Sequence, residues 1–137
     1  MKSMNEADDL TEQRIAERLR ALGATLRMTK KGRIHTVDFR AAGAAISDAE
    51  AAALQQLDRL HELYLAGTAI SDAAIARLGS LERLETLDLE NTAVTDAALP
   101  RLARLPQLKL LVLRGTPVTR DAVAALRKQM IGARIVT

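Results

Sequence analysis

The sequence predicts an α/β solenoid, in which short parallel strands form a curved sheet on the concave side and helices cover the convex side. The first observation behind this prediction is a repeat: Leu63, Leu87 and Leu111 lie 24 positions apart. The second is the composition, which is 48% apolar and has Phe39 and Tyr64 as its only aromatic residues. Aliphatic columns at a fixed interval of roughly 20 to 50 residues are typical of repeat architectures, which stack similar layers into one core.

The first half of each unit predicts a short strand. Three units read LHELYLAGTAI, LETLDLENTAV and LKLLVLRGTPV, so leucines recur at alternate positions. Alternation with a period of two is typical of a strand that buries one face. An earlier unit fits with Val37 and Phe39 as its buried pair, but its link from Phe39 to Ile46 is longer than in the later units. We therefore expect a bulged turn around residues 41–45.

The second half of each unit predicts a helix. It opens with a hydroxyl-bearing residue, which is Ser47, Ser71, Thr95 or Thr119. An Asp follows directly in the first three units, whereas Arg120 stands between Thr119 and the Asp in the last. Such side chains accept hydrogen bonds from the free backbone N–H groups of a helix start, and Glu50 completes a capping-box pattern with Ser47. Ile75 and Leu78 are three positions apart, which predicts one helical face turned towards the strand leucines.

The N-terminal segment has a different pattern, which predicts a helix followed by a strand. The apolar residues on one helical face of residues 12–22 are Ile15, Leu19 and Leu22. Gly23 is typical of a helix end, and residues 24–28 alternate like a strand. A turn at residues 30–32 is expected to bring this strand back onto the one that follows.

The chain is predicted to be one continuous domain with two parts. Because a solenoid needs its first apolar layer covered, we interpret residues 1–33 as an N-terminal capping helix and hairpin strand. Residues 34–137 hold the repeats, about four units of 24 residues plus a truncated terminal strand at Ile135.

The repeat strings carry a family resemblance. LAGTAISDAA and LENTAVTDAA resemble leucine-rich-repeat proteins of bacterial type, particularly the small planctomycete-like repeats that read L-x-G-T-x-V-T-D-A-G. The resemblance covers roughly residues 34–137 and implies a leucine-rich-repeat solenoid that presents a binding surface, in a family without a common catalytic residue. Most such repeats form a hydrogen-bonded Asn ladder after the strand. Because Thr68, Thr92 and Thr116 occupy that place here, we expect a threonine ladder.

Composition excludes several classes of function. The chain has no cysteine, so disulfides, thiolate metal sites and cysteine nucleophiles are absent. Its net charge of +3 is scattered, and no apolar run predicts a signal or a membrane helix. We therefore expect a cytoplasmic protein with no cofactor that binds neither nucleic acid nor membrane, although a trimmed signal or tag stays open. A basic stripe on the helices is interpreted as a solvated face, because no aromatic residues are interleaved with it. Its members are Arg77, Arg101, Arg104, Arg127 and Lys128.

Three groups of residues are candidates for catalytic or metal sites. His35 and His61 precede strand leucines and lie close if the strands are neighbours, but a metal site needs further ligands, so surface histidines are the favoured interpretation. Ser47 and Ser71 stand at helix starts and outside any nucleophile elbow, so capping is favoured over catalysis. Acidic residues on the strands are interpreted as a solvated or partner-facing surface. They are Asp38, Glu62, Glu85, Asp88 and Glu90.

Alternation along the strands predicts which side chains form the concave face, and this is the proposed binding surface. Its residues are Asp38, Arg40, Glu62, Tyr64, Thr86, Asp88, Glu90, Leu110, Val112 and Arg114, with Thr36 and Ala66 between them. Tyr64 near the middle, and Leu110 and Val112 beside Arg114, give the mixture that suits the centre of a protein interface. The alternative is that a neighbouring copy or a further segment covers Leu110 and Val112.

The leading hypothesis is a non-catalytic protein-protein interaction module that binds a protein partner of unknown identity on its concave face. The alternative is a structural element that self-assembles through its C-terminal edge near Ile135 or its apolar patch, so a monomer or a weak homo-oligomer is expected. An enzyme ranks last, because catalysis needs a pocket with convergent polar groups.

Overall fold

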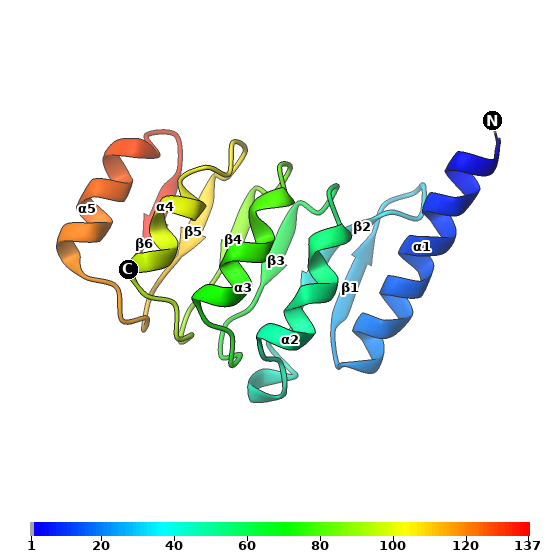
Figure 1. The fold of residues 1–137 in the computed structure, drawn as a ribbon, viewed down its shortest axis with the longest axis horizontal. Coiled ribbons are helices and arrows are strands. Elements are labelled where there is room, and N and C mark those ends of the chain that lie inside the picture. The colour runs from blue at the N-terminus through cyan, green and yellow to red at the C-terminus, as the bar shows by residue number, and fades with distance from the viewer. Residues whose placement is uncertain (1) are drawn as a thin grey trace.

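The structure is a computed structural model that describes residues 2–137, with side chains from residue 11 onward. The elements are, in chain order, α1 (Lys2–Ala21), β1 (Thr25–Met28), β2 (Ile34–Asp38), η1 (Gly43–Ala45), α2 (Asp48–Ala51), η2 (Ala52–Gln56), β3 (Glu62–Tyr64), α3 (Asp72–Arg77), η3 (Leu78–Ser80), β4 (Thr86–Asp88), η4 (Asp96–Ala98), α4 (Leu99–Leu102), β5 (Leu110–Val112), α5 (Arg120–Gln129) and β6 (Arg134–Val136), where η marks a 3-10 helix. They follow one another from α1 at one end of the molecule to α5 and β6 at the other (Figure 1).

The strands form one six-stranded sheet in the order β1 to β6. β1 is antiparallel to β2, whereas β2 to β6 are parallel. The residues that stand side by side across the parallel strands are Val37, Leu63, Leu87, Leu111 and Ile135. From Leu63 onward they are 24 positions apart, because each strand-helix crossover returns the chain to the same register. The predicted α/β fold with a parallel sheet is confirmed.

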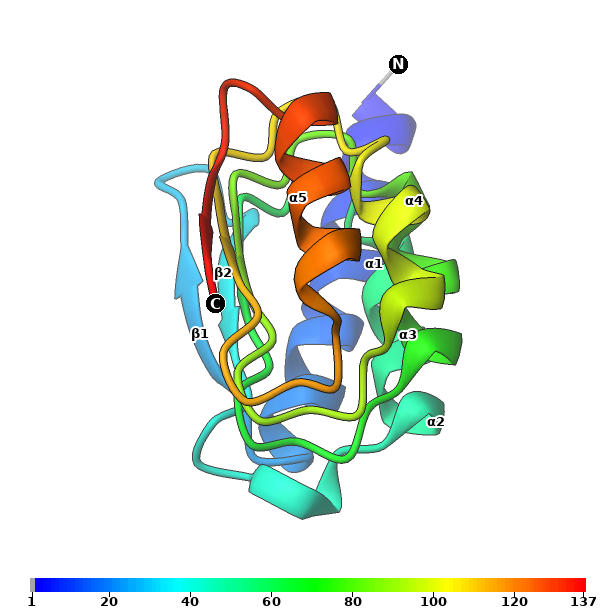
Figure 2. The ribbon, with the colours of Figure 1, turned by 90° about the vertical axis from the view of Figure 1, so that its left-hand side faces the viewer.

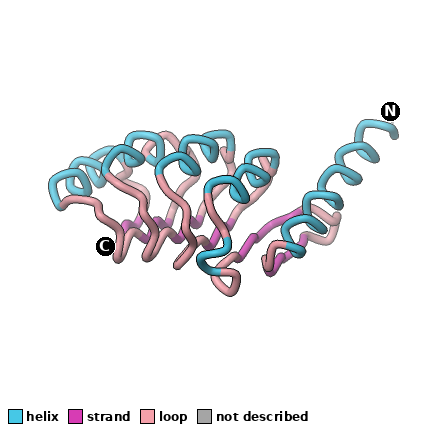
Figure 3. Tube along the Cα trace, turned by 60° about the horizontal axis from the view of Figure 1, so that its bottom comes forward, coloured by secondary structure: helices cyan, strands magenta, loops and turns pink. Residues whose placement is uncertain are grey.

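The helices lie on one side of the sheet and leave its other side open (Figure 2). The same division into a row of strands and a row of helices is visible from below in Figure 3. Among the residues that the structure describes, no helix has the length and apolar content needed to span a membrane.

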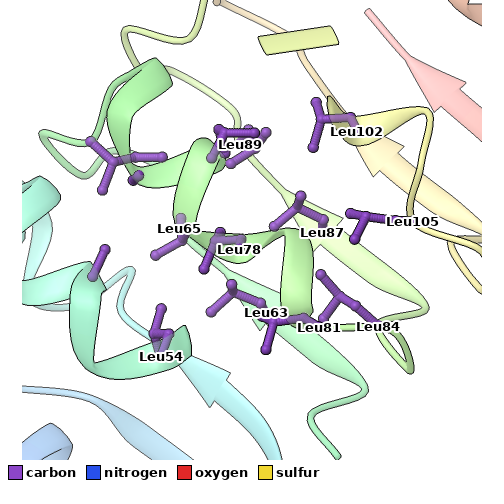
Figure 4. Close-up of a cluster of buried hydrophobic side chains, with 14 of the residues drawn as sticks. Leu54, Leu63, Leu65, Leu78, Leu81, Leu84, Leu87, Leu89, Leu102 and Leu105 are labelled. Atoms are coloured by element: carbon purple, nitrogen blue, oxygen red, sulfur yellow. The ribbon is translucent and has the colours of Figure 1, made fainter. Parts of the chain in front are cut away.

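The core lies between the sheet and the helices. Leu63 and Leu87 of the strands, and Leu78 and Leu102 of the helical segments, have 0–1% of their surface exposed. Figure 4 shows such leucines from successive units gathered into one cluster. Fully burying a leucine side chain contributes about 1.5–3 kcal/mol relative to leaving it exposed, so these layers are the main source of stability.

The N-terminal segment forms the helix and strand hairpin that its pattern predicts, but the helix is longer. α1 begins at Lys2 rather than at Glu12, which lies within the helix and is buried. The Glu12 carboxylate accepts a hydrogen bond from the backbone N–H of Ile34 at 3.0 Å, which ties α1 to the start of β2. Leu19 of α1 is fully buried, and Gly23, which follows the end of the helix, has φ +100°.

The link after β2 accommodates its additional residues as a 3-10 turn. Residues 43–45 form η1, and Gly43 adopts φ +55°, within the region where a bulged turn was predicted. The helical half of a unit is also less regular than predicted. α2 is four residues long and continues into η2, whereas α4 is preceded by η4.

The predicted threonine ladder between units is wrong. The hydroxyl of Thr68 donates to the carbonyl of Leu65, at 2.7 Å, and Thr92 and Thr116 donate in the same way within their own units. A threonine hydroxyl is too short to reach the next unit when the carbonyl three residues earlier is so close. Backbone hydrogen bonds link the units at this turn instead, such as that from the N–H of Gly67 to the carbonyl of Glu90.

Side chains do link the units, but on the helical side. Asp48 accepts hydrogen bonds from the backbone N–H and the hydroxyl of Ser71, which lies 23 residues later. The same pair of bonds joins Asp72 to Thr95 and Asp96 to Thr119. Within the first unit, the backbone N–H of Ser47 donates to the Glu50 carboxylate, as the capping-box pattern predicts, and the Ser47 hydroxyl donates to the same oxygen.

Candidate functional site

The sheet side that the helices leave uncovered carries all ten residues predicted to bind, and we call these ten residues the open sheet face. Along each strand the alternate residues, such as Leu63, are buried against the helices. Two rows cross the strands in register: Glu62, Thr86 and Leu110 in the first, and Asp38, Tyr64, Asp88 and Val112 in the second. Arg40, Glu90 and Arg114 come two positions after the second row. The structure thus brings the set together, and its role in binding stays a prediction.

One end of the second row is a compact cluster around Tyr64. The Arg40 guanidinium donates to both carboxylate oxygens of Asp38, with Nη2 2.7 Å from Oδ2 and Nε 3.0 Å from Oδ1. The same guanidinium lies 4.5 Å from the centre of the Tyr64 ring. A cation over an aromatic face is attracted by the ring, so Arg40 is held by two interactions at once.

These contacts shift the ionisation of all three side chains. The hydrogen bond from Arg40 lowers the pKa of Asp38, and the reciprocal bond raises the pKa of Arg40. Burial, with a smaller effect from the charge of Glu62, raises the pKa of Tyr64 although Arg40 opposes this. At neutral pH the cluster therefore consists of an ion pair and a neutral phenol.

Asp88, in the middle of the second row, is the most deeply buried member of the open sheet face. Only 9% of its surface is exposed. Its Oδ1 accepts a hydrogen bond from the backbone N–H of Glu90 at 3.0 Å, and no ion pair joins it to another described residue. Glu90 has its own cation in Arg114, at 3.7 Å, but both side chains are exposed enough for solvent to weaken this pair.

The apolar part of the open sheet face lies towards the C-terminal strands. Leu110 and Val112 are half-buried, and β6 continues their rows with Arg134 and Val136. Sequence reasoning did not include these two β6 residues in the face, although their interval of 24 from Leu110 and Val112 is visible in the sequence. Val136 extends the apolar area by one strand.

The two histidines lie together at the strand entrances. The rings of His35 and His61 are stacked in parallel, with centres 4.8 Å apart. His35 Nδ1 lies 2.8 Å from the Thr36 hydroxyl, whereas His61 Nδ1 is buried without a hydrogen-bond partner. Within the described part of the chain, no three His, Cys, Asp or Glu side chains are grouped closely enough to hold a metal ion.

The carboxylates near the strand entrances are engaged by neighbouring side chains. Thr36 donates a hydrogen bond to Glu62 at 2.9 Å. Glu85 forms an ion pair with Lys109, whose Nζ lies 3.1 Å from Glu85 Oε1, and His61 Nε2 lies 4.0 Å from Glu85 Oε2. These contacts bring the two carboxylates together with a hydroxyl group and basic groups at the strand entrances.

The two candidate catalytic serines have structural partners. Ser47 bonds to Glu50, and Ser71 bonds to Asp48 and accepts from the N–H of Ala73. A cavity of about 510 Å³ lies at the C-terminal end of the sheet, lined by residues such as Leu108. No residue of the open sheet face contributes to it.

The predicted basic stripe lies on the exposed side of the helices. Arg77, Arg101, Arg104 and Lys128 are exposed, as expected for a solvated face. Arg127 also has a structural contact, because its Nη2 donates to the carbonyl of Ile135 at 3.1 Å and thereby ties α5 to β6.

The residues that sequence reasoning missed are Asp48, Asp72 and Asp96, which link successive units. Their signal was present, because a hydroxyl-bearing residue followed by Asp recurs every 24 residues in three units. We interpreted both positions as local helix caps. The hydroxyl is indeed a cap, but the Asp reaches the next unit.

Comparisons with known proteins give a likeness in fold. No family model matches the chain, and no curated protein sequence matches it. A leucine-rich-repeat protein of Leptospira interrogans is 21% identical over 63% of this chain and 27% of its own, with a TM-score of 0.47. An internalin of Listeria monocytogenes is 19% identical over 62% of this chain and 30% of its own, with a TM-score of 0.43. The crystal structure of PEPR1-AtPEP1 is 13% identical over 96% of this chain and 24% of that chain, with a TM-score of 0.50.

The fold defines the class of this chain. Its leucine columns and its parallel sheet in constant register make it an α/β fold of leucine-rich-repeat type, and the likeness to PEPR1-AtPEP1 extends over nearly the whole chain. The chain spans between 24% and 30% of the length of the three structures.

Proposed function

We propose that this chain is a non-catalytic protein-protein interaction module that binds a protein partner on its open sheet face, the predicted concave side. The observation that carries the proposal is the surface composition of this face. Tyr64 and Asp88 stand beside Leu110 and Val112, all of them partly or mostly buried, in fixed register across three parallel strands. Aromatic side chains are enriched at the centre of protein interfaces, and neighbouring aliphatic side chains on a rigid surface add apolar area that a partner can bury.

The rigidity of the face supports binding by complementarity. Arg40 is fixed by Asp38 and by the Tyr64 ring, so these side chains lose little further freedom when a partner docks. Ordering a side chain with many rotamers costs about 0.5–1.5 kcal/mol, and a face that is ordered in advance avoids much of that cost. The α1 helix and the β1–β2 hairpin are proposed to act as the cap of the first layer.

The test is an affinity pull-down from a lysate of the source organism, read by mass spectrometry. The wild type is compared with a variant that carries Tyr64→Ala, Asp88→Ala and Val112→Ala. The matched control carries Arg77→Ala, Arg101→Ala and Arg104→Ala, which are three exposed changes on the helical side. Circular dichroism verifies that both variants are folded.

A partner that is lost only from the open-face variant supports the proposal. A partner that binds this variant as well as the wild type contradicts it. Recovery of the chain alone, bound to itself, favours the second candidate function.

The second candidate function is self-assembly through the C-terminal end, and it is favoured by one observation there. Ile131 has 88% of its surface exposed, beside the cavity lined by Leu105, Leu108 and Met130. Gly132 stands 24 positions after Leu108, at the equivalent position of the next unit, and the cavity is open because glycine has no side chain to fill it. Sedimentation velocity over a range of protein concentrations, with Ile131→Ser as the variant, tests it: a dimer that the variant loses supports self-assembly, and a strict monomer contradicts it.

A further inference from the structure

The charges on the open sheet face are unevenly paired. Three carboxylates on or beside the face have a cation within 4 Å, and these pairs are Asp38 with Arg40, Glu85 with Lys109, and Glu90 with Arg114. Glu62 and Asp88 form no ion pair with any residue that the structure describes. The face therefore presents an excess of negative charge near its middle.

Asp88 differs from Glu62 in its burial. Nine-tenths of Asp88 is removed from solvent, and its Oδ1 accepts the backbone N–H of Glu90. Its Oδ2 accepts no hydrogen bond from a described residue. A carboxylate that has lost much of its hydration gains more from an added cation than an exposed one does, because a charge-assisted hydrogen bond is stronger where water is excluded.

Arg40 is a candidate partner for Asp88 within the chain, but its guanidinium group is already bound to Asp38. Its Nε and Nη2 donate to Asp38, and its plane covers the Tyr64 ring. The charge of Asp88 reaches it only through space, as one of the smaller influences that raise the pKa of Arg40. Asp88 is therefore left for a cation from outside the chain.

An apolar surface adjoins this carboxylate. Val112 lies opposite Asp88 on the next strand, and Val136 lies opposite Val112 on the strand after that. Both valines are half-buried, as is Leu110 in the first row. A ligand group that continues from Asp88 towards β6 therefore meets aliphatic side chains.

We propose that the open sheet face binds an extended segment of a partner protein that presents Lys or Arg to Asp88 and an aliphatic side chain to Val112 and Val136. This inference rests on the proposed function and specifies its partner. Neighbouring strands are about 4.8 Å apart, and side chains two positions apart in an extended segment are separated by about 6.8 Å. An aliphatic residue two positions from the basic residue thus reaches the space between the two valines.

An acidic segment does not fit the same face. It would meet Glu62, Asp88 and Glu90, whereas the cations stand to the side of these acids. Arg40 is bound to Asp38, Arg114 lies beside Glu90, and Arg134 lies on β6 in register with Leu110. Like charges at short range disfavour binding, so the charge pattern selects for a basic segment over an acidic one.

The experiment uses a phage-displayed library of random dodecapeptides selected on the immobilised chain. Four proteins are compared: the wild type, Asp88→Asn, the open-face triple variant described above, and Asp121→Asn. Asp88→Asn keeps an oxygen acceptor for the Glu90 N–H, removes the charge, and replaces the second acceptor oxygen by an NH2 donor. Asp121→Asn makes the same change of charge on an exposed residue of α5 and serves as the matched control.

The wild type and Asp121→Asn are expected to enrich peptides in which Lys or Arg is followed or preceded, two positions away, by an aliphatic residue. Asp88→Asn is expected to lose the basic preference. An individual basic peptide resynthesised from the selection is expected to bind Asp88→Asn roughly ten- to a hundredfold more weakly than the wild type, because a hydrogen bond to a charged group is lost. Added salt should weaken binding to the wild type more than to Asp88→Asn.

The outcomes separate this inference from the proposed function. In one outcome, peptides bind the wild type but not the triple variant, and the peptides selected on Asp88→Asn contain as much Lys and Arg as those selected on the wild type. This result supports the open sheet face as a binding surface and overturns the assignment of a basic residue to Asp88. Peptides that bind the triple variant as well as the wild type overturn both. A selection that enriches acidic peptides, or no peptide, on the wild type overturns the inference about a basic segment.

Discussion

The carboxylate of Asp48 accepts hydrogen bonds from both the backbone N–H and the hydroxyl of Ser71, at 2.7 and 2.6 Å. Its Oδ1 also accepts the N–H of Ala74 at 3.2 Å, a donor that it shares with the carbonyl of Ser71, so one side chain binds two backbone N–H groups at the start of the next helix. Successive helices are thereby linked by side chains on one side of the molecule, while the strands are linked by backbone bonds on the other.

Removal of one such link should destabilise the fold. Asp72→Ala leaves the N–H of Thr95 without its acceptor and should lower the free energy of unfolding by about 1–3 kcal/mol. Asp121 lies in the first turn of α5 as Asp72 does in α3, but it is exposed, and Asp121→Ala should cost less than about 1 kcal/mol. Urea unfolding of the two variants measures this difference. Equal losses would show that the links contribute no more than a charge at a helix start.

The Asp48 link should also make stability depend on acid. Burial raises the pKa of Asp48, but the hydrogen bonds from Ser71 and Ala74 outweigh it, so the pKa lies below its ordinary value. A carboxyl with a depressed pKa in the folded state stabilises the protein above its unfolded pKa of about 3.9, and this contribution is lost as the pH falls through the folded pKa.

The expected result is a thermal midpoint that falls below about pH 4, and falls less steeply for Asp48→Asn than for the wild type. Circular dichroism melts at pH values from about 6 down to about 2 provide the measurement. Parallel curves for the two proteins would contradict a contribution from Asp48.

Two adjacent leucines of β5 offer a direct test of the strand orientation. Leu111 is fully buried, whereas Leu110 is half-buried on the open sheet face. Leu111→Ala should cost about 2–5 kcal/mol, because it leaves a cavity in the core, and Leu110→Ala should cost less than about 1 kcal/mol. Chemical unfolding of both variants measures the two losses. The reverse order would mean that the strand is shifted by one residue.

The single tyrosine and the absence of tryptophan make the Tyr64 cluster accessible to ultraviolet titration. Burial and the charge of Glu62 raise the pKa of Tyr64, while Arg40 lowers it. Glu62→Gln should therefore lower the pKa of the phenol, and Arg40→Met should raise it further. Arg114→Met, which removes a cation paired with Glu90 instead, is the control. Shifts of the same sign in the first two variants would disprove this arrangement of charges.

The repeat made most of the fold predictable. Leucines such as Leu63 and Leu87 recur at an interval that only stacked strands satisfy, so the sequence was sufficient for the sheet and its buried columns. It was insufficient where two positions serve different neighbours. Ser71 and Asp72 look like one cap, and only the packing of helix on helix shows that Asp72 reaches Thr95.

The open sheet face was predictable in membership but not in pairing. Alternation identifies Asp38 and Asp88 as equivalent positions in different units. Their difference arises two residues later, where Arg40 pairs with Asp38, whereas Glu90 is itself an acid and pairs with Arg114. The position of Arg40 depends on its contact with the Tyr64 ring, and the periodicity of the sequence does not predict such a contact.

The constant register has a consequence for how the chain reaches its structure. Each parallel strand bonds only to the strands one unit before and one unit after it, so the chain makes its sheet contacts at a short and uniform separation in sequence. Closing each of these loops carries the same modest entropic cost, and no unit has to wait for a distant segment. Folding can therefore nucleate at any adjacent pair of units and propagate outward in both directions.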